Sequence, residues 1–190
     1  MVGLFVIIVA ILISVLGANI RPDSSVDANN QIQQIARLNP GTKVKHLKVR
    51  KNREIEAVSF FGKLFFGGTT NKYKYVPINN YRFENDQIII EEFTVDDNYL
   101  EPSFKYFSIA DVVYPLSISV DEKVKFLPDD LLMIALIDDQ QLNSSIPILR
   151  AHIEAYNIET ATYFLGTDKQ GRDMLSRLMA GTIVSLSVGV

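Results

Sequence analysis

The first twenty residues contain no charged side chain, and this feature constrains the fold more than any other. The segment MVGLFVIIVAILISVLGANI is apolar around the whole circumference of a helix, and Arg21 is the first charge. A helix of this length rises about 30 Å, which matches the hydrocarbon core of a bilayer. Because no polar face remains, the segment is unlike a surface helix of a globular domain. We therefore expect a transmembrane helix at residues 1–20.

Two other interpretations of residues 1–20 stay open. One is a helix buried in a protein core, and the other is a cleaved signal peptide with Val15 and Gly17 near its cleavage site. Two features are atypical of a signal peptide: the segment has no basic n-region, and its apolar run is longer than that of a usual signal peptide. Orientation is ambiguous as well. Six of the nineteen basic residues lie in 43–53. By the positive-inside rule, this cluster would place the domain after the helix in the cytoplasm. The cluster lies more than twenty residues from the helix end, however, and the rule weakens at that distance.

The composition excludes several classes of protein and of site. The 190-residue chain has a formal net charge of −3, so no global basic field points to nucleic acid. It has no cysteine, which excludes disulfides, thiolate metal sites and a cysteine nucleophile. His46 and His152 stand in no readable arrangement with a serine or a carboxylate. We therefore assign them no role and expect no metal site, no cofactor and no enzymatic activity.

Residues 21–146 predict a short helical linker at 21–42 and a β-rich domain at 43–146. Ser24 and Asp27 offer helix caps, and Asn39-Pro40-Gly41 ends the linker. Asn79-Asn80 and Asn85-Asp86 have the chemistry of turns. The run 131–137 fits a strand or a helix, and residues 148–162 look helical. Strands are expected at 44–49, 55–61, 64–66, 73–76, 87–93, 104–109, 116–120 and 123–127.

The clusters of charged and aromatic side chains in this β-rich domain fit structural roles better than binding or metal sites. The basic run 43–53 fits a solvated strand face better than a site for an anionic partner. Phe60, Phe61, Phe65 and Phe66 fit a hairpin core better than a contact with lipid or a partner. The acidic pairs fit exposed turns, because their spacing matches no calcium loop. These pairs are Asp96-Asp97, Asp129-Asp130 and Asp138-Asp139.

Near the end of the sequence, Gly166 and Gly171 are separated by four residues and followed by Arg172-Asp173. A phosphate-binding loop would need Lys and then Ser or Thr, and Asp168 would repel the phosphate. A helix start fits better, because Thr167 with Gln170 forms a capping box.

The residues after this turn predict an amphipathic helix that lies along a membrane surface. Met174, Leu175, Leu178 and Met179 form one apolar stripe, and Gly181 breaks the helix. A second apolar segment then begins. We also expect the carboxylates of the turn to pair with its arginines and tie the loop to the helix.

Residues 166–189 closely resemble the signature that precedes the second transmembrane helix of ABC-type permeases. The match is to the C-type permease subunit of dipeptide, oligopeptide and nickel importers. The matching residues are Gly166, Thr167, Asp168, Gly171, Arg172, Asp173, Ser176, Arg177, Gly181, Val184, Ser185, Leu186 and Gly189. Four features depart from the family: Tyr163-Phe164 replaces His-Pro, Ile183 stands where an arginine is common, no basic stretch precedes residues 1–20, and the segment between helix and motif exceeds 100 residues instead of being short.

By this resemblance the fold is membrane-anchored α+β. It has transmembrane helix 1 at residues 1–20, a β-rich extracytoplasmic insertion, a helix with the motif at 147–182, and the start of transmembrane helix 2 at 183–190. The chain would be the N-terminal part of a permease, without the later helices and the ATPase-coupling loop. It would sit in the bacterial inner membrane, with residues 21–182 on the extracytoplasmic side.

The resemblance also implies a function, which is transport of peptides or a related small solute by an ABC-type importer. The motif residues would have structural and gating roles, and ATP would be bound by separate subunits. The implied partners are a second permease subunit, two cytoplasmic ATPase subunits, an extracytoplasmic substrate-binding protein and the lipid bilayer. The alternative is a membrane-anchored extracytoplasmic binding or adaptor domain.

Overall fold

The computed structural model describes residues 2–56, 58–59, 62–63, 67–95, 101–120 and 122–188. The chain divides into two compact units. The helical unit consists of Met1–Thr42, Glu56–Asn71 and Thr162–Val190, and the sheet unit consists of Lys43–Ile55 and Lys72–Ala161. The expected aromatic cluster at Phe60, Phe61, Phe65 and Phe66 lies outside the described residues, as does the acidic pair Asp96-Asp97.

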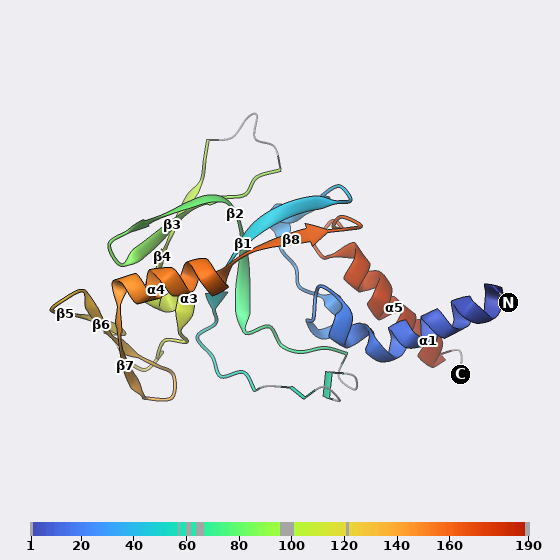
Figure 1. Cartoon of the computed structure of the whole chain (residues 1–190), viewed down its shortest axis with the longest axis horizontal. Coiled ribbons are helices and arrows are strands. Elements are labelled where there is room, and N and C mark those ends of the chain that lie inside the picture. Colours follow the sequence, from blue (N-terminus) through green and yellow to red (C-terminus); the bar gives the residue numbers. More distant parts are fainter. Residues whose placement is uncertain are drawn as a thin grey trace. The chain divides into compact units, whose positions relative to one another are not determined.

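The sheet unit is built on two sheets (Figure 1). The larger has the order β4-β3-β2-β1-β8, and the smaller has the order β5-β6-β7. The strands of the larger sheet are β1 (Thr42–Arg50), β2 (Tyr73–Glu84), β3 (Gln87–Glu92), β4 (Phe104–Ser108) and β8 (Ile158–Tyr163). Those of the smaller sheet are β5 (Val124–Leu127), β6 (Leu131–Ala135) and β7 (Gln141–Ser145). The pairings β1–β2, β2–β3, β3–β4, β5–β6 and β6–β7 are all antiparallel.

Three short helical segments complete the sheet unit and close its core. They are α3 (Ile109–Val113), α4 (Ile146–His152) and the π-helical turn η3 (Ile153–Asn157). Alternate residues of the strands, such as Leu47 and Val49 of β1, point into one cluster with the helical residues Ile109 and Leu149. Burying each of these side chains stabilises the fold by roughly 1.5–3 kcal/mol.

Several strand predictions are confirmed, and other local predictions are wrong. Residues 55–56 and 58–59, the described part of the strand expected at 55–61, form no strand, and the strand expected at 64–66 lies outside the described residues. Asn79-Asn80 is not a turn but an irregularity inside β2, where the register with β3 shifts between Ile78 and Asn80. Residues 148–162 are not one helix, because the chain leaves η3 and enters β8 at Ile158. Residues 116–120 form no strand, and only Leu116 makes a bridge, to Leu136.

The helical unit contains two helices of substantial length, α1 (Val2–Ile20) and α5 (Met174–Val188), which lie alongside each other (Figure 1). The linker between Arg21 and Thr42 is not a single short helix. It forms two short 3-10 turns, η1 (Val26–Ala28) and η2 (Gln33–Ile35), and η1 also contacts α5. The helix α5 is continuous, so Gly181 does not end it as expected.

The membrane-anchored fold class must be corrected. No helix among the described residues combines the length and the apolar character needed to cross a membrane. The expected transmembrane helix at residues 1–20 is therefore wrong. The start of a second one, expected at 183–190, is wrong for the described residues 183–188, and residues 189–190 lie outside the described part of the chain. The observed fold is α+β with two antiparallel sheets. The lack of charge over residues 1–20 does not by itself show that a helix spans a bilayer. In the structure α1 lies against α5 and buries Gly17 and Ala18, whereas most of its large apolar side chains are exposed.

Candidate functional site

The spacing of two glycines at 166 and 171 has a direct structural cause within the helical unit. Gly166 and Gly171 have φ values of +70° and +71°, a backbone conformation that residues other than glycine rarely adopt. A Cβ atom at Gly166 would collide with the carbonyl oxygen of Leu38, and one at Gly171 with that of Ile32. The turn that contains both glycines therefore lies with its backbone directly against residues 32–38.

Thr167 joins the turn to the same segment through its side chain. Its Oγ1 accepts a hydrogen bond of 2.8 Å from the Leu38 amide and donates one to the Ile35 carbonyl. The backbone adds two further bonds, from the Thr167 amide to the Leu38 carbonyl and from the Arg37 amide to the Asp168 carbonyl. Thr167 thus serves this junction and does not form the expected capping box with Gln170.

The carboxylate of Asp168 stabilises the turn by accepting hydrogen bonds from residues within it. One carboxylate oxygen accepts from the amides of Gln170 and Arg172, and the other accepts from Arg172 Nε at 2.7 Å. Burial alone would raise the pKa of Asp168. The hydrogen bonds from Arg172 and Gln170, together with the charge of Arg172, have the larger effect and hold the pKa of Asp168 below its usual value. Arg177 Nε lies 3.9 Å from the same carboxylate. The expected pairing of Asp168 with the arginines is confirmed.

Asp173 has a different role, because it caps α5. Its Oδ2 accepts from the Ser176 amide at 2.8 Å and from the Ser176 hydroxyl. Ser176 Oγ in turn accepts from the Asp23 amide at 2.9 Å, which links the start of α5 to the chain just after α1. Asp173 and Ser176 are both buried, so this chain of hydrogen bonds is shielded from water.

Arg21 forms a second buried junction in the helical unit, which the sequence analysis missed. Only 4% of its surface is exposed, and its guanidinium donates to the carbonyl oxygens of Asp23, Ser25 and Gly67. Burial lowers the pKa of Arg21, with the charges of Asp23 and Asp27 acting in the opposite direction. The only sequence signal was that Arg21 is the first charge after a long apolar run.

The structure brings together eight of the ten residues singled out from the sequence, and two lie apart. The eight are Gly166, Thr167, Asp168, Gly171, Arg172, Asp173, Ser176 and Arg177, which we call the motif turn. Gly181 and Ser185 lie further along α5, both exposed, and a Cβ atom at Gly181 would meet open space. Asn29 joins the motif turn through its side-chain oxygen, which accepts from Arg172 Nη1 at 3.1 Å.

The motif turn is built to position chain segments. Its carboxylates are occupied by amides, a hydroxyl and guanidinium groups of the same unit. The described residues include no group of three or more His, Cys, Asp or Glu side chains that could hold a metal ion. What this arrangement can do is fix the direction in which α5 leaves the turn, relative to the end of α1. No family model, curated protein or solved structure matches the chain.

Proposed function

We propose that this chain is a component of an ABC-type importer for peptides or a related small solute. The motif turn would be its structural joint, and it would perform no chemistry itself. ATP would be bound and hydrolysed by two separate cytoplasmic ATPase subunits. A second permease subunit, an extracytoplasmic substrate-binding protein and the lipid of the bacterial inner membrane would be its other partners.

The observation that carries this proposal is the closed network of the motif turn. Three of the residues that resemble the importer signature make long-range hydrogen bonds through their side chains: Thr167 to Ile35 and Leu38, Ser176 to Asp23, and Arg172 to Asn29. A signature that arose by chance would have no reason to coincide with the residues that connect α5 to the segment after α1. Such a joint is what a transport subunit needs where two helices must keep a fixed relation while their surroundings move.

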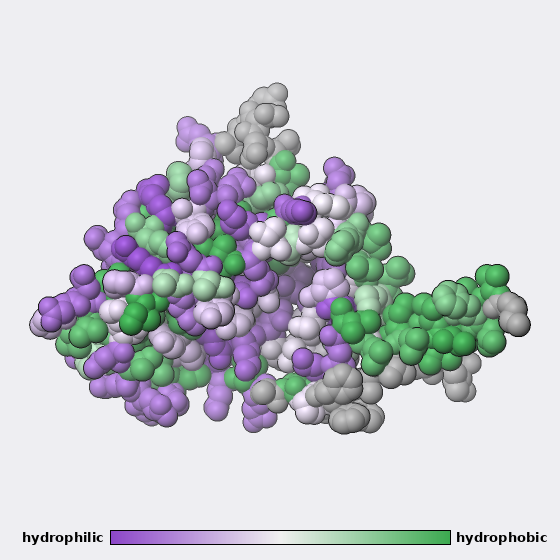
Figure 2. Space-filling model, viewed as in Figure 1, coloured by the Kyte–Doolittle hydropathy of each residue, from purple (hydrophilic) through white to green (hydrophobic). Residues whose placement is uncertain are grey.

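The exposed apolar surface of the helical unit supports the same proposal. Large hydrophobic side chains of α1 are exposed along its length, and Figure 2 shows them as a continuous hydrophobic surface. Exposed patches of this kind mark contacts with proteins or lipid. In the importer, the other subunits and the surrounding lipid would cover this surface. The proposal does not require either helix to cross the bilayer.

A second candidate function, a binding or adaptor domain, is favoured by the sheet unit. That unit has its own hydrophobic core and is a compact body of its own. A module of this kind in an importer would contact the substrate-binding protein. The two candidates are compatible, because one concerns the helical unit and the other the sheet unit.

The proposal is tested by purification and by uptake. A tagged full-length chain is isolated from detergent-solubilised cells of the source organism, and co-purifying proteins are identified by mass spectrometry. We expect an ATP-binding-cassette subunit among them. In parallel, uptake of radiolabelled dipeptides, tripeptides and nickel is measured after deletion of the gene. Unchanged uptake of all of them, together with no ATPase subunit in the purified sample, would contradict the proposal.

The role of the motif turn is tested with variants in the same uptake assay. Asp168→Asn combined with Arg172→Gln removes the ion pair that closes the turn, and we expect uptake to fall to the level of the deletion strain. Lys169→Gln is the matched control, because Lys169 is exposed in the same turn and its charge takes part in none of the ion pairs of the described residues. Equal uptake by the double variant and the control would contradict a role for the joint.

A further inference from the structure

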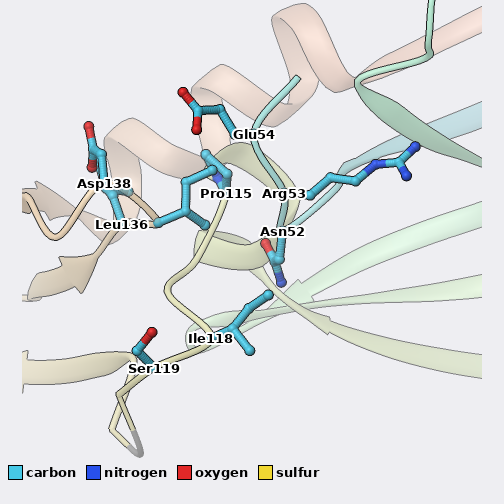
Figure 3. Close-up of a pocket in the computed structure, with 9 residues that line it drawn as sticks. Asn52, Arg53, Glu54, Pro115, Ile118, Ser119, Leu136 and Asp138 are labelled. Carbon is cyan, nitrogen blue, oxygen red and sulfur yellow. The ribbon is translucent and has the colours of Figure 1, made fainter. Parts of the chain in front are cut away.

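The sheet unit contains a cavity that lies outside the motif turn and that the proposed function does not use. Its volume is about 440 Å³, within the range of roughly 300–1,000 Å³ typical of small-molecule sites. Three segments form its walls (Figure 3): residues 52–54 after β1, residues 115–119 after α3, and residues 136–138 between β6 and β7. All three segments belong to the sheet unit.

Hydrogen bonds hold these walls in place without a ligand. The side chain of Asn52 donates to Asp111 Oδ1 at 2.7 Å and accepts from the Leu116 amide at 2.8 Å. The backbone joins the second and third walls, through bonds from Ser117 to Ala135 and from Ile137 to Pro115. A cavity with walls fixed in this way loses little conformational entropy when a ligand enters.

The lining combines an apolar surface with two carboxylates. Pro115, Ile118 and Leu136 supply the apolar part, and Ile118 is 73% exposed. The carboxylates of Glu54 and Asp138 lie on the same side of the cavity in Figure 3, whereas the Arg53 guanidinium extends away from both. Within the described part of the chain, neither carboxylate forms an ion pair.

We propose that this cavity binds a small amphipathic amine, in which a primary ammonium group is joined to a branched apolar group. The ammonium group lies between Glu54 and Asp138, where two negative charges attract it. The apolar group covers Pro115, Ile118 and Leu136 and removes them from water. Two sources share this chemistry, the free amino end of a short peptide and a simple alkyl amine. The inference concerns the sheet unit alone, so it stands independently of the importer proposal.

The experiment is a titration of the full-length chain in detergent micelles with three probes. They are L-leucinamide, which stands for a peptide amino end, 3-methylbutylamine, which is a simple amine of the same shape, and N-acetyl-L-leucinamide, which has no charge. Binding is measured by calorimetry and by the NMR shifts of the amides that line the cavity. We expect the two amines to bind and to shift these amides, and the acetylated probe to bind at least tenfold more weakly. Tighter binding of leucinamide than of 3-methylbutylamine identifies a peptide end as the source, and equal binding identifies a simple amine.

Variants locate the site. Combining Glu54→Gln with Asp138→Asn should weaken binding of the amines about tenfold, which is within the range for two exposed ion pairs, and should reduce its dependence on salt. Ile118→Ser should weaken amine binding through the lost apolar contact. Glu154→Gln is the matched control, because Glu154 is an exposed carboxylate on η3 that does not line the cavity.

Three results would overturn the inference: no shift of the lining amides with any probe, equal binding of the acetylated probe, or unchanged binding by the double carboxylate variant. Circular dichroism of each variant confirms that the fold is retained. Because no transport is measured, failure of the importer proposal leaves this result unaffected, and failure here leaves the importer proposal unaffected.

Discussion

At the scale of single residues, two glycines test whether the close backbone approach of the motif turn stabilises the helical unit. Gly171 has φ of +71° and faces the Ile32 carbonyl, so Gly171→Ala adds both backbone strain and a collision. We expect it to lower the free energy of unfolding by about 2–4 kcal/mol. The measurement is urea denaturation of the full chain in micelles.

The control for this substitution is another glycine of the same unit. Gly181 lies inside α5 with open space where a Cβ would be, so Gly181→Ala should raise the free energy of unfolding by about 0.5–1 kcal/mol. Equal effects of the two substitutions would show that residues 32–38 and the motif turn are not in close backbone contact.

A second prediction at this scale concerns the buried His46 of β1. Burial lowers the pKa of His46 to about 4, although the charge of Glu159 and a hydrogen bond with the Val44 backbone act in the opposite direction. The unfolded chain takes up this proton near the ordinary value of 6.5, and the folded chain does not. Stability is therefore complete above pH 6.5 and is lost as the pH falls towards 4, by roughly 3 kcal/mol.

This loss can be assigned to His46 by substitution. The midpoint of urea unfolding is measured between pH 7 and pH 4 for the natural chain, for His46→Gln and for His152→Gln. We expect His46→Gln to reduce the slope between pH 6.5 and pH 4 and the control His152→Gln, which replaces a histidine exposed on α4, to leave it unchanged. An imidazole of His46 that titrates near 6.5 in an NMR experiment would refute the prediction.

At the scale of elements, the start of α5 depends on a cap in which Asp173 accepts a hydrogen bond from Ser176, three positions further along the chain. Asp173→Ala removes the acceptor for the Ser176 amide and should cost about 1–2 kcal/mol. Asp173→Asn keeps an oxygen in that place and should cost less. Hydrogen exchange of the amides of residues 174–178 is the measurement. Unchanged protection in Asp173→Ala would show that α5 is held by its packing on α1 and not by its cap.

Elements were predictable from sequence where local pattern decides them. Strands β1, β3, β4 and β5 lie where strands were expected, because alternation along a strand is a local property. Only the first part of β2 was expected, at 73–76. The start of β8 was missed, since Ile158 follows directly on a helical turn and nothing local marks the change. The cap of α5 was assigned to Thr167, whose hydroxyl is instead used by Ile35, more than a hundred residues away in the sequence.

The candidate sites show the same division between local and distant information. Pairing of Asp168 with Arg172 could be predicted, because the two residues are one helical turn apart in sequence. The distant partners of the motif turn could not be predicted, since no property of these residues indicates what they contact. They are Asp23, which bonds to Ser176, Asn29, which bonds to Arg172, and Leu38, which bonds to Thr167. The cavity of the sheet unit was missed for the same reason. Its walls come from three separate segments, and Asp138 was interpreted only as part of an exposed turn.

At the scale of the whole molecule, the uneven distribution of apolar surface decides how the chain behaves in solution. The large side chains exposed on α1 are Val2, Leu4, Phe5, Val6, Ile7, Ile8, Ile11, Leu12, Leu16 and Ile20. Each Å² of such surface gains roughly 25 cal/mol when it is covered. The net charge of −3 is too small to keep copies of the chain apart against this gain.

We therefore predict that the full chain associates through α1, with itself in buffer and with vesicles of phosphatidylcholine when these are supplied. Combining Phe5→Ser, Ile8→Ser and Leu12→Ser breaks one exposed face of α1, because these residues are three and four positions apart. Sedimentation in buffer should then give a monomer, and flotation with vesicles should be lost. The control combines Phe126→Ser, Ile148→Ser and Tyr156→Ser, three side chains of the sheet unit that are about as exposed. Only substitutions in the contact surface should convert the associated chain into a monomer. If association persists in the α1 variant but is lost in the control variant, the contact lies on the sheet unit and the prediction is wrong.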